Sequence, residues 1–428
     1  MTTYGRKLNP YRHLRESFGV KGIRQSITVT NNPSSIDQNQ QLLVRFPNLG
    51  EHDLIVPGTV RLAFTIELNS TDDNRRVVQN LGRAIVKKLC IKISGNEIMS
   101  IDDSDIYYIY NYLCKTKQER NNLVYQGIDE SRNFNVTKLR VDAGDGDDTK
   151  LSDKTIADTF GNRFYIPLDF ELLEAHMPYY QSGLGDRLEY ELTFNDYSRV
   201  IMASAPDSTY AINNISLEFD MVTHADLATM VRNQYMGKMS ILYDRVLRHR
   251  KIVKNKNDTL WNINLNTPAR SMKGILMVFE EQAAAFARNS EKFYNPKINK
   301  VEVTIEGIPN QLYSQGMKAY HMWDEIQKQF SGGDKNHPEV DVVSKDLNLS
   351  DVSIGEYLTN KYALWLDLRT TDDNSLHGSG RRIENASEGI TIQIAKTAEA
   401  AGAINIYLFV IQDAQLNIET GRFVTALY

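Results

Sequence analysis

"KKLCIKISG" (residues 87–95) and "NKVEVTIEG" (residues 299–307) carry one pattern at two places, half a chain apart. At a shift of 212 residues, Ile93 aligns with Ile305, and each stretch ends in a glycine. Apolar and polar residues alternate in both stretches, which predicts a β-strand with one buried face, and the glycine predicts a turn. The sequence therefore predicts the same strand and turn twice.

The alternation also predicts which side chains of the first strand are buried. Successive side chains of a strand point to opposite faces, so residues two apart share a face. We expect Leu89, Ile91 and Ile93 to face a core and Lys92 to point away from it.

A helix is expected soon after each of these strands, because apolar residues recur there at helical spacing. In the first half the apolar face consists of Ile106, Ile109, Tyr110 and Leu113. In the second half it consists of Ala319, Met322, Trp323, Ile326 and Phe330. Acidic residues that suit a helix start come before or within the first turn of the first helix, namely Asp102, Asp103 and Asp105. The two helices align at a shift of 213, one residue more than the strands.

Further strand-like segments pair up in the same order along the two halves. The pairs are 59–68 with 273–281, 163–170 with 362–368, 187–194 with 389–395, and 215–222 with 404–411. Each match is weak, and one explanation is coincidence among similar strands. Together with 87–95 and 299–307 they make five matches in one order, which favours the other explanation, an internal duplication.

The order of the elements predicts an all-β fold with a few short helices. Strands dominate and do not alternate with helices, which favours antiparallel sandwiches. Eight strands in two facing sheets form a jelly roll. We therefore predict a double jelly roll, two tandem antiparallel eight-stranded β-sandwiches, with a basic arm at 1–25 and sandwiches at 26–232 and 233–428. Long loops are expected at 115–158 and 331–359.

Composition and motifs point away from an enzyme. The net charge is −5, and the two cysteines, Cys90 and Cys114, fit neither a metal site nor a disulfide framework. The sequence lacks a phosphate-binding loop, a complete dinucleotide fingerprint and a nucleophile elbow. The acidic stretch 142–148 fails the calcium-loop spacing and is expected to be a solvated loop. We predict no catalytic residue, no cofactor and no metal.

Targeting signals are also missing from the sequence. No apolar run is long enough to span a bilayer, and the first residues do not resemble a secretory signal. We therefore expect synthesis inside the cell.

Two segments are basic within this acidic chain. The first segment lies near the N-terminus and contains the candidate contact residues Arg6, Lys7, Arg12, Arg15, Lys21 and Arg24. The second segment is 245–256, which contains no acidic residue. Three interpretations stay open: a solvated face, contact with phosphates, or contact with an acidic neighbouring subunit.

Three longer stretches resemble one protein family. They are "NLGRAIVKKLCIKISGNEIMSIDD" (80–103), "FYIPLDFELLEAHMPYYQSGLGDRLEYELTF" (164–194) and "LHGSGRRIENASEGITIQI" (376–394). They look like the double jelly-roll major capsid proteins of the adenovirus-like lineage, in particular those of Polinton (Maverick) elements and adintovirus-like viruses. The resemblance runs from about residue 40 to the end of the sequence.

The resemblance implies a structural protein without chemistry. It implies pseudo-hexagonal homotrimeric capsomers that tile the icosahedral shell of a double-stranded DNA virus or a virus-like mobile element. The implied partners are further copies of the chain, a vertex (penton) protein and packaged DNA, and the implied location is the virion. The basic arm is expected on the inner surface, against DNA or a neighbouring capsomer.

Two other functions are compatible with the sequence. A non-enzymatic β-sandwich module that binds carbohydrate or a receptor would be a monomer with an aromatic-lined groove. A minor or vertex capsid protein would carry one jelly roll, which the duplication disfavours.

Overall fold

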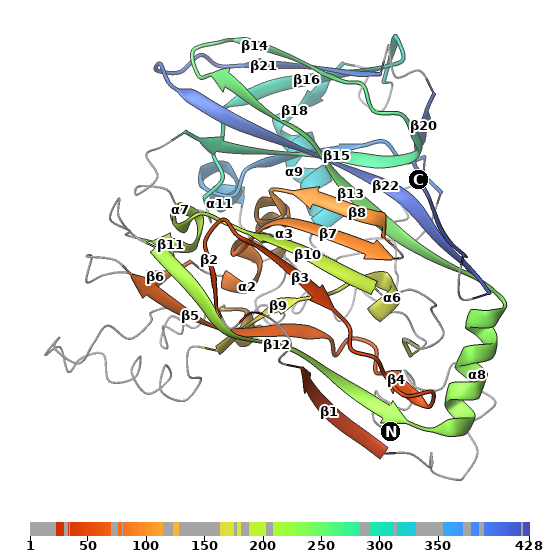
Figure 1. Ribbon diagram of the computed structural model, residues 1–428. Coiled ribbons are helices and arrows are strands. Elements are labelled where there is room, and N and C mark those ends of the chain that lie inside the picture. The colour runs from red at the N-terminus through yellow and green to blue at the C-terminus, as the bar shows by residue number, and fades with distance from the viewer. Residues whose placement is uncertain are drawn as a thin grey trace, which may run out of the picture.

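The computed structural model (Figure 1) contains two β-sandwiches and a few helices. It describes residues 23–29, 33, 35–69, 76–78, 80–93, 95–113, 123–127, 163–174, 178–180, 188–202, 209–282, 292–310, 315–330, 354–370, 378–384, 389–420 and 423–428. The predicted loops 115–158 and 331–359, apart from 123–127 and 354–359, lie outside these residues, as does the acidic stretch 142–148.

The first sandwich consists of two facing sheets, which we call 1A and 1B. Sheet 1A has the order β1 (Ile23–Val29), β12 (Thr209–Thr223), β5 (Arg61–Asn69), β9 (Arg163–Pro167), with β2 (Ser35–Asp37) and β4 (Asp53–Ile55) beside β12. Sheet 1B has the order β3 (Gln41–Arg45), β10 (Leu188–Phe194), β7 (Val86–Ile93), β8 (Asn96–Asp102). A separate ribbon joins β6 (Arg76–Val77) to β11 (Ile201–Met202).

The second sandwich likewise consists of sheets 2A and 2B. Sheet 2A has the order β13 (Lys238–Asn255), β22 (Ala403–Glu419), β15 (Ala269–Glu281), β19 (Ala363–Asp367), with β20 (Arg381–Ile383) and β23 (Phe423–Leu427) at its sides. Sheet 2B has the order β14 (Leu260–Leu265), β21 (Ile390–Lys396), β16 (Ile298–Ile305), β17 (Ile308–Pro309), with β18 (Met317–Lys318) beside β16.

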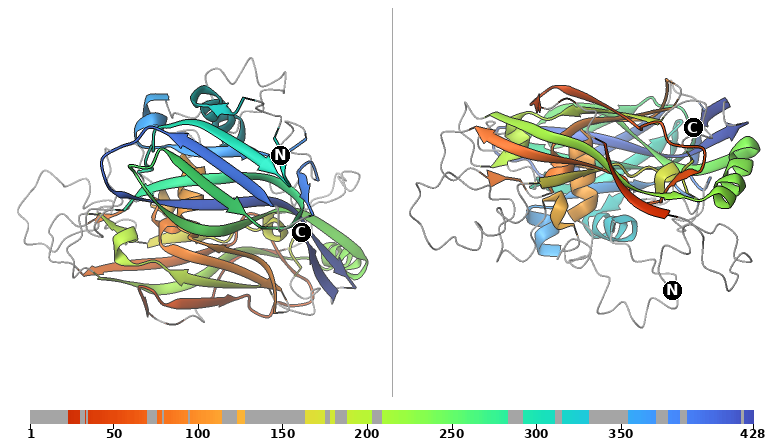
Figure 2. Two further views of the ribbon diagram at one scale, coloured as in Figure 1. Left: turned by 90° about the horizontal axis from the view of Figure 1, so that it is seen from above. Right: turned by 60° about the horizontal axis from the view of Figure 1, so that its bottom comes forward.

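Short helices lie between the strands. They are α2 (Leu81–Ala84), α3 (Ser104–Leu113), η2 (Val124–Gln126), α6 (Glu171–Glu174), α7 (Tyr197–Val200), α8 (Ala225–Met236), α9 (Ala319–Phe330) and α11 (Ile354–Thr359). Helix α8 lies at the side of the molecule and leads from β12 into β13 (Figure 2). The predicted boundary at 232/233 therefore falls inside this helix.

The two sandwiches repeat one strand order, which confirms the double jelly roll. The path β1–β12–β5–β9 corresponds to β13–β22–β15–β19, and β3–β10–β7–β8 corresponds to β14–β21–β16–β17. Every predicted segment pair falls on such a pair of strands: β5 with β15, β9 with β19, β10 with β21, β12 with β22, and β7 with β16. All these neighbouring strands pair antiparallel.

The repeated glycine forms the same tight turn in each half. Ile93 pairs with Asn96, and Ile305 pairs with Ile308, so two residues connect the strands in both hairpins. Gly95 has a φ of 74° and Gly307 a φ of 79°, which glycine adopts without steric cost. Two-residue hairpin turns require such positive φ values, so the glycine is part of the repeated motif.

The burial predicted for β7 is confirmed, with one addition. Leu89, Ile91 and Ile93 are buried, and Lys92 is partly exposed and forms an ion pair with Glu191 of β10. Cys90, on the opposite face, is also buried. The strand is therefore covered on both faces at this point.

The predicted alignment of the two helices at a shift of 213 is wrong. Lys88 pairs with Asp102, while its counterpart Lys300 pairs with Lys318, so the shift has become 216 at the start of the helices. The first half has the single strand β8 at this place, and the second half has the two short strands β17 and β18. The segment that contains β17 and β18 is four residues longer than its counterpart in the first half. At the new shift, the buried residues Ile106, Ile109 and Tyr110 match the buried Met322, Glu325 and Ile326. Ala319, predicted on the apolar face, is exposed for this reason.

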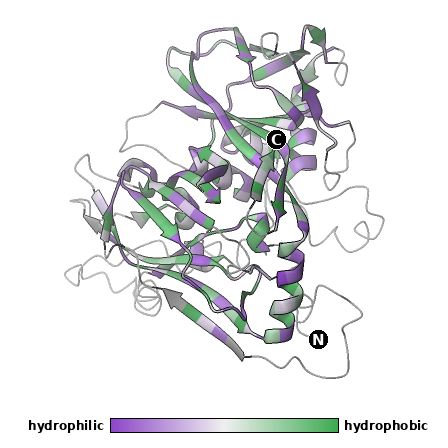
Figure 3. Ribbon diagram, turned by 45° about the vertical axis from the view of Figure 1, so that its right-hand side comes forward, coloured by the Kyte–Doolittle hydropathy of each residue, from purple (hydrophilic) through white to green (hydrophobic). Residues whose placement is uncertain are grey.

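The four sheets lie as layers. From top to bottom in Figure 1 the order is 2B, 2A, 1B, 1A, so sheet 2A faces the first sandwich. Hydrophobic and hydrophilic residues alternate along many of the strands (Figure 3). The buried hydrophobic residues of both sandwiches form one continuous cluster. The two halves are therefore joined by a packed interface.

Candidate functional site between the two sandwiches

Most of the predicted contact residues lie outside the residues that the structure describes. These are Arg6, Lys7, Arg12, Arg15 and Lys21. Arg24 lies in β1, where its backbone is opposite Val222 of β12. The strand thus begins within the segment 1–25 that the sequence assigns to the arm. The arm as an assembly contact stays a prediction.

The second basic segment, 245–256, forms most of β13, and several of its cations have partners within the chain. Arg248 pairs with Asp103, and its Nη2 lies 3.6 Å from Oδ2 of Asp102. The guanidinium carbon of Arg245 lies 3.6 Å from the ring centre of Tyr428. Arg248 therefore ties the second sandwich to the first, and Asp102 and Asp103 take part in this contact instead of only facing solvent.

A buried ionic cluster, which we call the Arg199 cluster, connects the two sandwiches. Nη1 and Nη2 of Arg199, on α7, donate to the two carboxylate oxygens of Glu280 on β15 at 2.8 and 3.0 Å. Nη2 also donates to the hydroxyl of Tyr407 on β22 at 3.0 Å, and that hydroxyl donates to Glu280 at 3.0 Å. Nε of Arg199 lies 3.7 Å from Oδ2 of Asp105 on α3. All four side chains are buried.

Aromatic side chains of α3, the helix that carries Asp105, pack against the second sandwich. The ring of Tyr107 lies 5.5 Å from that of Phe409 on β22. The ring of Tyr110 contacts those of Phe293 and Phe330 edge-on at 5.3 and 5.7 Å. Such edge-to-face pairs stabilise beyond the area that they bury. Helix α3 therefore belongs to the first sandwich in sequence and to the interface in space.

The arrangement favours a fixed angle between the sandwiches. A bidentate arginine–carboxylate pair has a narrow geometry, and leaving either buried charge without the other is costly. Sequence reasoning did not find this cluster, because Arg199 and Glu280 are 81 residues apart and belong to no motif. The cluster suits a rigid building block.

Asp105 makes this interface sensitive to pH. Burial raises the pKa of Asp105 to about 7, and the nearby Arg199 offsets only part of that effect. The folded state therefore holds a proton that the unfolded state has lost, and stability falls as the pH rises from about 4 to about 7. We expect Asp105→Asn to melt at a higher temperature than wild type at about pH 8, and the difference to shrink toward pH 4. Melting curves across this range will measure it; a constant difference would contradict the assignment.

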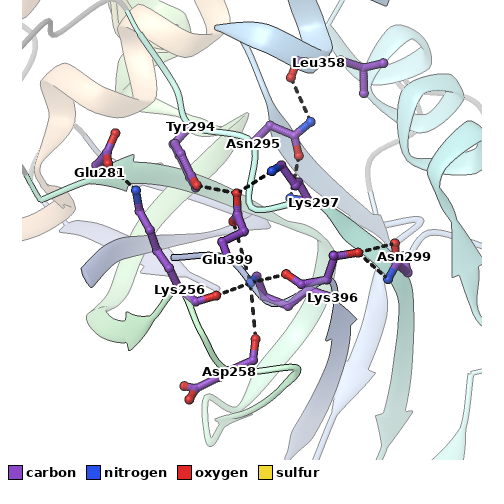
Figure 4. A network of polar contacts seen from close by, with 11 residues as sticks. Lys256, Asp258, Glu281, Tyr294, Asn295, Lys297, Asn299, Leu358, Lys396 and Glu399 are labelled. Atoms are coloured by element: carbon purple, nitrogen blue, oxygen red, sulfur yellow. Dashed lines mark hydrogen bonds and ion pairs between the residues drawn. The ribbon is translucent and has the colours of Figure 1, made fainter. Parts of the chain in front are cut away.

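A second polar network fastens the end of the second sandwich (Figure 4). Nζ of Lys396 donates to the carbonyl oxygens of Lys256, Thr397 and Asp258 at 2.6, 2.7 and 3.3 Å. Glu399 accepts from the hydroxyl of Tyr294 at 2.9 Å. Burial lowers the pKa of Lys396. The Lys396 side chain is fully covered, so it holds the turn after β13 in place and is not offered to a substrate.

The described surface includes a hollow on each sandwich. The hollow on the first sandwich has a volume of 690 Å³ and lies between β1, β5, β9 and α3. The hollow on the second has a volume of 580 Å³ and includes Arg245, Arg270 and Arg382. Among the described residues, no group of histidine, cysteine or acidic side chains could hold a metal ion. Within the same residues, no helix is both long and apolar enough to cross a membrane.

No family model matches the chain, and no curated protein matches it. Several solved structures match the chain. PBCV-1 VP54, fitted into a reconstruction of the virophage Sputnik, matches with a TM-score of 0.58 at 11% identity, over 97% of this chain and 99% of that one. A chain of the Sputnik virophage structure matches with a TM-score of 0.57 at 12% identity, over 96% and 90%.

The mavirus major capsid protein matches with a TM-score of 0.52 at 10% identity, over 98% of this chain and 93% of that one. At such identities the similarity shows the fold. Nearly the whole chain therefore adopts the double jelly roll of these proteins.

Proposed function

We propose that this chain is a major capsid protein, which assembles as pseudo-hexagonal homotrimeric capsomers into the icosahedral shell of a double-stranded DNA virus or virus-like mobile element. The observation that carries the proposal is the pair of sandwiches with one strand order, β1 to β12 and β13 to β23, matched over 98% of this chain by a protein named as a major capsid protein. The work of such a protein is assembly, and it needs neither a catalytic residue nor a cofactor.

Two similar sandwiches per chain explain how a trimer resembles a hexagon. Three chains joined by heterologous contacts close into a ring of six similar blocks. Such a ring needs a constant angle between the two blocks of each chain. The buried Arg199 cluster and the seated helix α3 support that requirement.

The mass of the purified protein in solution tests the proposal. We expect a trimer by native mass spectrometry and light scattering, and a ring with a six-sided outline by electron microscopy. A monomer at every concentration would favour the alternative, a β-sandwich that binds carbohydrate or a receptor. A fivefold ring would favour a vertex protein.

The proposal includes further partners, namely neighbouring capsomers, a vertex protein and packaged DNA. It places the protein in the virion and gives the basic arm a role in assembly. Deleting residues 1–22 is expected to leave the melting temperature unchanged, because the first described strand begins at Ile23, but to lower the yield of closed shells. Particle counts by electron microscopy will measure the yield.

A second arm variant separates charge from apolar contact. Replacing Arg6, Lys7, Arg12, Arg15 and Lys21 with glutamine removes the charge and keeps the apolar residues. If the arm binds DNA, this variant loses DNA affinity and the steep salt dependence that phosphate contacts cause. Normal shell yield from the deletion would contradict a role of the arm in assembly.

A further inference from the structure

The contact between the two halves of one chain supplies a template for the contact between chains. Helix α3 of the first sandwich is received by a site on the second sandwich. Its direct contacts there include Phe409 of β22, Phe330 of α9 and the carbonyl of Lys361, two residues before β19, which accepts from Tyr110 at 3.4 Å. Arg199 of α7 connects Asp105 of α3 to Glu280 of β15. Each of these elements of the second sandwich has a counterpart in the first sandwich.

The counterparts β5, β12, α3 and β9 line the 690 Å³ hollow on the first sandwich. Arg61 comes from β5, Glu218 from β12, Tyr108 from α3 and Tyr165 from β9. Among the described residues, the elements that α3 and its neighbours cover on the second sandwich therefore correspond to elements that line a hollow on the first.

Two side chains of the hollow have properties expected where another protein surface packs against it. Asn80 lines it and is only 2% exposed, yet among the described residues its side-chain amide has no hydrogen-bond partner. Buried polar groups in proteins are almost always hydrogen-bonded, so an amide of this kind indicates a missing partner group. Tyr125 stacks on Tyr165 at 5.1 Å and leaves 46% of its own surface exposed.

The element that corresponds to α3 is α9, and it carries an exposed aromatic side chain. Tyr320 in its first turn is 65% exposed. Helix α11 packs onto α9 through Tyr357 and Trp323, whose rings lie 4.9 Å apart. It adds Ile354 and Leu358, both exposed and one turn apart. Large apolar side chains exposed together mark an interaction surface.

We infer that the α9–α11 face of one copy docks into the hollow on the first sandwich of a second copy. The contact repeats between chains the way in which α3 docks within the chain. It is heterologous, because two different surfaces meet, and three such contacts close a ring. The inference rests on the proposed function and names the two surfaces that build the capsomer.

Two sets of variants test the surfaces separately. The helix-face variant carries Tyr320→Asp and Leu358→Asp, and the hollow variant carries Tyr125→Asp. Asn80→Gly is a milder hollow variant, because Asn80 has a φ of 58° that glycine adopts readily. The control is Leu260→Asp, at an exposed position on the edge strand β14 and separated from β16 by β21. Circular dichroism and melting curves identify variants that fold.

We expect each folded surface variant to require about 100-fold more protein to form the trimer, while the control behaves as wild type. Mixing the helix-face and hollow variants should give a one-to-one dimer, because each retains the surface that the other lacks. A wild-type trimer that both surface variants preserve would overturn this inference and leave the proposed function standing. A wild-type monomer at all concentrations would overturn both.

Discussion

Replacing Arg199 with methionine is expected to lower the free energy of unfolding by about 3–5 kcal/mol. The change leaves Glu280 buried between the sandwiches without the two hydrogen bonds that Arg199 donates, at 2.8 and 3.0 Å. Methionine fills much of the same volume as arginine. The loss of stability therefore comes mainly from the uncompensated charge of Glu280 and less from a cavity. Urea unfolding monitored by fluorescence and by circular dichroism will measure it.

A matched control comes from an exposed pair of the same chemistry. Nη1 of Arg232 lies 2.8 Å from Oε1 of Glu51, and the two side chains are 49% and 66% exposed. Arg232→Met should cost only about 0–1 kcal/mol, because water solvates the carboxylate that remains. The double variant Arg199→Met with Glu280→Leu should recover much of the stability. Equal losses for Arg199→Met and Arg232→Met would show that burial does not matter at this interface.

Cutting Ile91 to alanine is expected to cost about 2–5 kcal/mol. Ile91 lies in the middle of β7, is completely buried, and pairs with Tyr190 on one side and Met99 on the other. The packed sheets on either side can close the resulting cavity only in part, so lost contacts add to lost hydrophobic transfer. Chemical unfolding of the two proteins side by side will give the difference.

Lys87 in the same strand is the control for this change. Its side chain is exposed, so Lys87→Ala should alter stability by less than about 0.5 kcal/mol. An Ile91→Ala protein with an unchanged melting temperature would mean that the inward face of β7 had been assigned wrongly. The comparison tests the burial pattern directly.

The strands could be predicted well because their signal is local. Alternation within β7 and β16 depends only on neighbouring residues, and it identified both strands, the inward face of β7 and the turn at each glycine. The repeated order of segments then led to two sandwiches. The helix alignment failed because four residues inserted between β17 and β18 changed the shift without changing either pattern.

The candidate site could not be predicted in the same way. Asp105 reads as an acidic residue in the first turn of a helix, which is normally exposed, yet docking of the second sandwich buries it beside Arg199. Cys90 reads as an outward-facing residue, yet it is buried too. The partners of the Arg199 cluster come from α3, α7, β15 and β22, and no spacing connects them.

Sequence alone was sufficient to predict two similar all-β halves, the matching order of their segments along the chain and the side of β7 that enters its core. This is because a strand shows its buried face through a period of two residues. The partner of the other face became known only from the fold. The surface that covers α3 and the pairing of Arg199 with Glu280 depend on how distant segments of the chain pack together. The same holds for the hollow on the first sandwich. Packing of this kind produces no periodic pattern in the sequence.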